Sequence, residues 1–107
     1  MISRIVKLTF RSDAIDDFKK IFEVSSQKIR SSKGCISLKL LQVEDDPRIF
    51  FTYSVWEDES YLDMYRSTDF FRGTWSSCKK LFDDKPEAWT TQVLYSSDHE
   101  EDTFREL

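Results

Sequence analysis

Two neighbouring segments, residues 35–43 and 49–56, carry apolar side chains on both faces of an extended backbone. Successive side chains of a strand point to opposite faces of its sheet. In the second segment the apolar side chains divide between the faces, with Phe51, Tyr53 and Val55 on one and Phe50 and Trp56 on the other. Pro47 in the intervening turn ends the pairing, which favours an antiparallel hairpin. A sheet that contains this hairpin needs a cover on each face.

The other segments predict two more strands and a second helical unit. Residues 2–10 alternate as a first strand, and residues 88–95 alternate more weakly as a last one. Between the hairpin and the last strand, residues 57–65 and 71–82 have apolar side chains at helical spacing, as a short segment followed by a longer run.

A helix is predicted between the first strand and the hairpin. Apolar residues recur at helical spacing from Ile15 to Ile29. Ser12 or Asp13 is suited to the N-cap, and Gly34 is suited to a left-handed stop.

The order β, α, β, β, α, β predicts an α+β, ferredoxin-like fold. In this plan a four-stranded antiparallel sheet carries both helical units on one face. A chain of 107 residues forms one domain, which we place at residues 1–95. No helix remains for the other apolar face, so we expect a second copy of the sheet to cover it in a two-fold homodimer.

Charge and composition narrow the functional classes. Five of the 20 acidic residues and one of the 16 basic residues lie in the acidic tail, residues 96–107. The remaining body is neutral and lacks the basic stripe that nucleic acid requires. We expect no nucleic-acid partner and no metal, since the single histidine, His99, lies in the tail.

The chain has no long apolar segment, which predicts a cytoplasmic protein without a membrane partner. Cys35 and Cys78 fit neither a disulfide framework nor a zinc pattern, so we interpret them as buried thiols.

The aromatic residues gather between positions 50 and 89, which contain all three tryptophans. The segments SVWEDESYLDMYRSTDFFRGTW and LFDDKPEAW resemble the antibiotic biosynthesis monooxygenase family, a branch of the dimeric α+β barrel superfamily. The resemblance implies a two-fold dimeric barrel. It also implies one of several activities, which include cofactor-independent oxygenation of aromatic polyketides and quinols, haem degradation and isomerisation of a signal molecule.

The haem-degrading members use an asparagine, a tryptophan and an axial histidine. Alignment on Trp56 places these near Val6, at Tyr65 and at Trp75. An indole nitrogen carries a proton and has no lone pair for iron, so haem degradation is disfavoured.

A cofactor-independent oxygenase needs an aromatic-lined cavity that binds a phenol and excludes water. The residues expected to line it are Trp56, Tyr65, Phe71 and Trp75, with Tyr53 as a hydrogen-bond donor. No general base is assigned, because the sequence does not determine whether the side chains of Lys7, Lys39 and Asp63 point toward the cavity. We therefore expect a monooxygenase that acts on a small hydroxylated aromatic or quinol without cofactor.

Two other interpretations remain open. The aromatic side chains at helical and strand spacing are also what an ordinary core contains. A non-catalytic dimeric module that binds a small apolar ligand or serves a regulatory or stress role is the alternative function, and a small-molecule isomerase is a further one.

Overall fold

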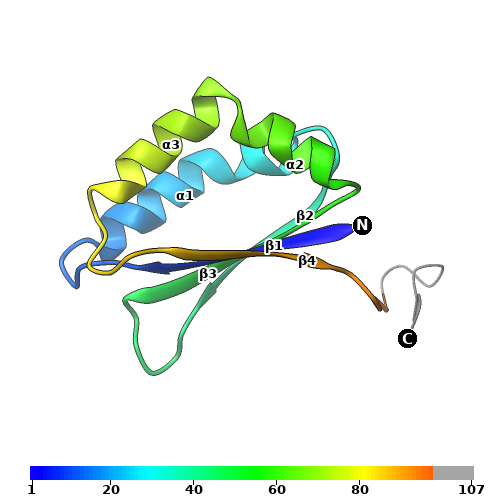
Figure 1. The fold of residues 1–107 in the computed structure, drawn as a ribbon. Helices are drawn as coiled ribbons and strands as arrows, with labels where there is room; N and C mark the ends of the chain where they lie inside the picture. Colours follow the sequence, from blue (N-terminus) through cyan, green and yellow to red (C-terminus); the bar gives the residue numbers. More distant parts are fainter. Residues whose placement is uncertain (98–107) are drawn as a thin grey trace.

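The computed structural model describes residues 1–97. It contains four strands and three helices (Figure 1), whose bounds are β1 Ile2–Thr9, α1 Ile15–Arg30, β2 Cys35–Gln42, β3 Ile49–Trp56, α2 Glu59–Arg66, α3 Asp69–Lys79 and β4 Glu87–Gln92. The last strand is shorter than predicted, because pairing with β1 stops at Gln92 opposite Ile2. The acidic tail from Asp98 onward, with His99, lies outside the described residues.

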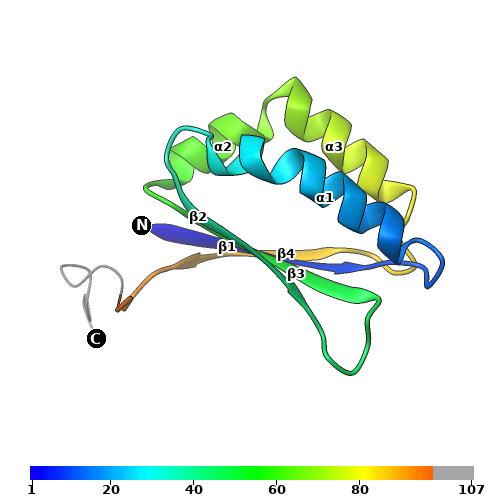
Figure 2. The ribbon, with the colours of Figure 1, turned by 180° about the vertical axis from the view of Figure 1, so that it is seen from behind.

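The sheet has the strand order β2-β3-β1-β4 and is antiparallel at every pairing. Figures 1 and 2 show all three helices on one face of the sheet. The predicted ferredoxin-like α+β fold is therefore confirmed. Its second helical unit is divided into α2 and α3, because the Thr68 side chain caps a new helix by accepting from the Phe71 amide at 3.1 Å.

Two predicted helix signals of α1 are wrong. Ala14 is the N-cap and makes no side-chain cap bond, whereas the Asp13 carboxylate pairs with Arg11 at 3.3 Å. At the other end the helix stops at Arg30, four residues before Gly34. Gly34 does adopt a positive φ of 84°, but it does so in the turn that leads into β2.

The strand register fixes which side chains meet the helices. Residues paired directly across an antiparallel ladder share a face. In β1 the even-numbered residues Val6 and Leu8 pack under the helices. The odd-numbered residue Ile5 pairs with Tyr53 and Trp89, so these three point to the side that no helix covers.

We call this side the open face. It also carries Phe51 and Leu41, which follow the same register. Trp89 and Leu41 are 46% and 48% exposed, so apolar area lies uncovered here, as the two-sided pattern of the hairpin predicts.

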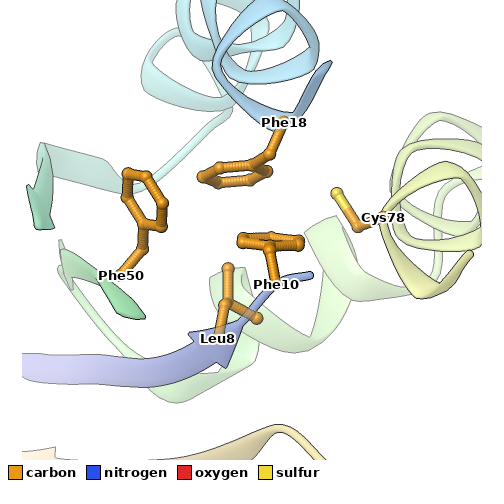
Figure 3. Packing of buried hydrophobic residues seen from close by; sticks show 5 residues of the cluster. All are labelled: Leu8, Phe10, Phe18, Phe50 and Cys78. Carbon is orange, nitrogen blue, oxygen red and sulfur yellow. The ribbon is translucent and has the colours of Figure 1, made fainter. Parts of the chain in front are cut away.

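A cluster of aromatic rings holds α1 against the sheet (Figure 3). Phe10 stacks on Phe18 with ring centroids 4.2 Å apart, and Phe50 meets Phe18 edge-on at 5.0 Å. Leu8 and Cys78 complete the cluster. Each such buried side chain contributes about 1.5–3 kcal/mol, so this cluster is a main source of stability.

The two glycines of the chain have opposite environments. Gly34 has a positive φ of 84°, and a Cβ placed on it would overlap the Tyr61 ring. Gly73 lies inside α3, and nothing lies within 4 Å of the Cβ it would carry.

We predict that Gly34→Ala lowers the free energy of unfolding by at least about 2 kcal/mol, because the new methyl group adds a clash to an unfavourable φ. Gly73→Ala is the matched control and is expected to raise it by about 0.5–1 kcal/mol. Urea unfolding of both variants measures the difference. Equal effects would contradict this account of the turn.

Candidate functional site

A cavity of about 370 Å³ lies between the helices and the face of the sheet that they cover. This volume is within the roughly 300–1,000 Å³ that small-molecule sites occupy. Strand residues form its floor, namely Arg4, Val6, Leu8, Leu38, Thr52, Ser54, Trp56 and Ala88. Helix residues form its roof, and these include Phe18, Ile21, Phe22, Leu62, Tyr65, Arg66, Phe71, Thr74, Trp75 and Cys78.

A continuous row of aromatic rings forms one wall of the cavity. Trp56 stacks on Tyr65 with centroids 5.5 Å apart, and Tyr65 meets Phe71 edge-on at 5.3 Å. Phe71 and Trp75 lie parallel at 6.3 Å, and Trp75 then meets Phe82 at 5.6 Å. The ring faces in this row offer a planar aromatic ligand stacking and edge-on partners.

The structure brings together four of the five site residues expected from the sequence. Trp56, Tyr65, Phe71 and Trp75 all line the cavity. Tyr53 does not, and its assignment to this cavity is corrected. Because side chains alternate along β3, Tyr53 points to the open face while Thr52 and Ser54 point to the cavity.

The indole of Trp56 is fixed from below. It is 1% exposed, and its Nε1–H donates to the Ser54 hydroxyl at 3.0 Å. A buried indole that satisfies its single donor in this way keeps its ring plane fixed. Trp56 therefore acts as a rigid base for the ring of Tyr65.

Tyr65 contributes the phenol of the cavity. Burial, with smaller effects of the Cys35 and Cys78 thiols, raises the pKa of Tyr65 to about 12. The group therefore keeps its proton at neutral pH. Within residues 1–97 its hydroxyl has no hydrogen-bond partner, so it is available to donate to a bound ligand.

Two arginines that were not expected from the sequence also line the cavity. Arg4 has the same parity as Val6 and Leu8 and so lies on the helix-covered face of β1. Its Nη1 donates to the Thr90 hydroxyl of β4 at 2.9 Å. Arg66 comes from the last turn of α2, where its Nη1 lies 3.9 Å from the Asp63 carboxylate.

None of the three side chains considered as a base lines the cavity. Lys7 and Lys39 have the parity of the open face, and Asp63 is absent from the lining. Among the described residues, Glu87 is the one acidic residue of the lining, but it pairs in register with Lys7, so its carboxylate points to the open face. Glu87 lies where β4 begins and is 3.9 Å from the Lys7 amine.

Both cysteines are buried and free, as predicted. Burial raises the pKa of Cys78 from 9.0 to about 11. For Cys35 burial also raises the pKa, against the opposing effect of Arg30. These thiols behave as small apolar side chains at neutral pH and not as nucleophiles.

Within the described part of the chain, no three His, Cys, Asp or Glu side chains are placed to share a metal ion. In the same residues no helix is long and apolar enough to cross a membrane.

Comparison with known proteins points to one family. A sequence model described as antibiotic biosynthesis monooxygenase matches residues 1–74. A Nitrosomonas europaea protein assigned to that family superimposes with a TM-score of 0.83 at 18% identity, over 89% of this chain and 100% of that one.

Two further solved structures are similar. A mutant of SnoaB, a cofactor-independent oxygenase from Streptomyces nogalater, has a TM-score of 0.81 at 14% identity, over 92% of this chain and 97% of that one. A conserved protein from Methanosarcina mazei Go1 has a TM-score of 0.81 at 20% identity, over 85% of this chain and 90% of that one. Such identities establish the fold alone. No curated protein matches the sequence.

We predict that alkaline pH destabilises the protein through Cys78. The folded pKa of about 11 lies above the ordinary value of 9.0. The contribution of the buried, protonated Cys78 thiol to the free energy of unfolding is therefore complete below pH 9 and is lost as the pH rises toward 11. Between these limits the free energy of unfolding should fall by about 2 kcal/mol more in the wild type than in Cys78→Ala. Urea unfolding at stepped pH measures this. Parallel curves for the two proteins would contradict the assignment.

Proposed function

Because the chain belongs to the antibiotic biosynthesis monooxygenase family, we propose that it is a cofactor-independent monooxygenase of a small hydroxylated aromatic or quinol. The observation that carries the proposal is the cavity of about 370 Å³ walled by aromatic rings. A similar fold belongs to SnoaB, a cofactor-independent oxygenase.

The chemistry proposed for a phenol is balanced without a further reductant. The phenol loses its O–H proton, and the electron pair spreads from oxygen to the ring carbon that reacts with O₂. One oxygen atom forms the new C=O bond there. The other leaves as water with the two hydrogens of the broken O–H and C–H bonds, so phenol and O₂ give quinone and water.

The residues of the cavity fit the requirements of this reaction. The row from Trp56 to Trp75 offers ring faces to hold a planar substrate and an apolar surface that excludes water from the reactive carbanion. Tyr65 remains protonated and can donate a hydrogen bond to a substrate oxygen. We therefore assign to the Tyr65 hydroxyl the hydrogen-bond donor role that was expected of Tyr53.

One observation favours the second candidate function. Among the described residues no carboxylate points into the cavity, because Glu87, the one acidic residue of its lining, shares the open-face parity of Lys7 and pairs with it. A general base is usually tuned by burial. A non-catalytic module that binds a small aromatic ligand would need no base, and turnover separates the two functions.

We also propose that the protein is a homodimer through the open face. Phe51 and Tyr53 from β3, with Leu41 and Trp89 from the outer strands, form an apolar surface over the whole width of the sheet. A second copy offers the same surface across a two-fold axis, so each sheet covers the other. Such packing would bury the exposed area of Trp89 and Leu41.

We expect the purified, chelator-treated protein to consume O₂ with at least one member of a panel of naphthols and quinols. Trp75→Ala should lower kcat/KM at least about tenfold, since the ring wall is interrupted. Phe70→Ala is the matched control, because Phe70 precedes Phe71 on α3 but does not line the cavity. An oxygen electrode measures both. Absence of uptake across the panel would leave the binding module as the function.

We expect sedimentation velocity to give a dimer at micromolar concentration. Phe51→Asp places a charge in the centre of the open face and should yield a monomer. Val24→Asp is the control, since Val24 lies on α1 and is 85% exposed. A wild-type monomer, or dissociation by Val24→Asp as well, would refute the interface.

A further inference from the structure

Two cations border a cavity that is otherwise largely apolar. Arg4 lies in its floor on β1, and Arg66 lies in its roof on α2. Arginine keeps its charge in proteins, so an uncharged ligand would leave Arg4 without a counterpart, whereas Arg66 has the Asp63 carboxylate at 3.9 Å. The cavity of an enzyme for neutral aromatic molecules has no need of them.

Arg4 is held in place with most of its donors unused. Its only hydrogen bond within residues 1–97 is the one from Nη1 to the Thr90 hydroxyl, at 2.9 Å. A guanidinium has five N–H donors in a fork that matches an anionic oxygen. No carboxylate of the described residues lies within ion-pair distance of it. Thr90 therefore orients the side chain without neutralising it.

Among the described residues, the charged side chains that border the cavity are the two arginines, and the nearby carboxylates lie outside it. Burial, followed by the charge of Arg66, lowers the pKa of Arg4, while Asp63 and Glu59 oppose that effect from α2. Neither of these carboxylates lines the cavity. Glu87 belongs to the lining, but its carboxylate points to the open face, where it pairs with Lys7. A negative charge inside the cavity would relieve the repulsion between the two arginines.

We infer that the cavity binds its aromatic ligand as an anion, whose charged oxygen accepts hydrogen bonds from Arg4 with Arg66 as the second cation. This rests on the proposed function, because it defines the form in which that same cavity holds its substrate. The charge is carried either by a carboxylate substituent or by an ionised ring hydroxyl.

An ionised ring hydroxyl would also explain how the cavity works without a buried base. The O–H bond of the phenol breaks, the electron pair stays on oxygen beside Arg4, and the proton passes to solvent water. Every residue of β4 is exposed, and Pro86 and Ala88 line the cavity, so the water has access at this edge. Stabilisation of the anion by Arg4 lowers the pKa of the bound phenol.

The experiment uses three nitroaromatic probes with the full chain: 4-nitrophenol, 4-nitrobenzoate and nitrobenzene. Absorption spectra of bound 4-nitrophenol across the pH range give its pKa in the cavity. We expect a value at least one unit below that of the free probe, which is a tenfold preference for the anion. In Arg4→Met the pKa should return to the free value or above it, with a partial return in Arg66→Met.

The control variant is Arg72→Met, because Arg72 is an exposed arginine of α3 that pairs with Asp69 outside the cavity. It should leave the bound pKa unchanged, and nitrobenzene affinity should stay within twofold in every variant. Tighter binding of 4-nitrobenzoate would assign the charge to a carboxylate, and tighter binding of 4-nitrophenolate to the ring oxygen. Wild-type protein that binds nitrobenzene as tightly as both anions would overturn the inference.

Failure of this inference and failure of the proposed function give different results. A lowered bound pKa without oxygen uptake would support an anion site in a binding module. Oxygen uptake that Arg4→Met leaves unchanged would support the monooxygenase and overturn the role of Arg4.

Discussion

The helices leave the edge strand β4 exposed, and the site depends on this uncovered edge. The aromatic cluster of Phe10, Phe18 and Phe50 holds α1 against the central strands. β4 is exposed at all of its residues. Between the packed centre and this bare edge the helices leave a cavity that the rings of α2 and α3 wall on one side. Arg4, bonded across to Thr90 of β4, lies on the side where the cavity meets solvent.

The strand pattern predicted much of the fold because alternation is a property of the backbone itself. The hairpin of β2 and β3 has the predicted pairing, and both faces of its strands are apolar as expected. The ends of α1 were less predictable, because its first turn has no side-chain cap and its last turn stops before the glycine. Asp13 bonds to Arg11, and Ala14 begins α1 without a side-chain cap. Gly34 has the left-handed conformation expected of it, but it lies in the turn into β2, where a Cβ would overlap the Tyr61 ring.

The apolar part of the site was visible in the sequence, and the polar part was not. Aromatic side chains at helical spacing pointed to Tyr65, Phe71 and Trp75. A charged residue in an alternating strand is usually taken as facing solvent, so Arg4 was missed. The signal that would have found it is parity, since it alternates in phase with Val6 and Leu8. The same alternation would have excluded Tyr53 from the cavity, because Tyr53 shares the open face with Phe51 on β3.

Position 75 shows what kind of chemistry this lining favours. The resemblance to haem-degrading relatives places an axial histidine there, and here Trp75 continues the row of rings to Phe82. Within the described residues the cavity offers two guanidinium groups and a phenol proton donor, and no histidine. Such groups stabilise negative charge but do not accept a proton. A ligand of this cavity is therefore selected by how readily it ionises as well as by its shape, because an anion gives the partly buried Arg4 a counterpart that no described carboxylate provides.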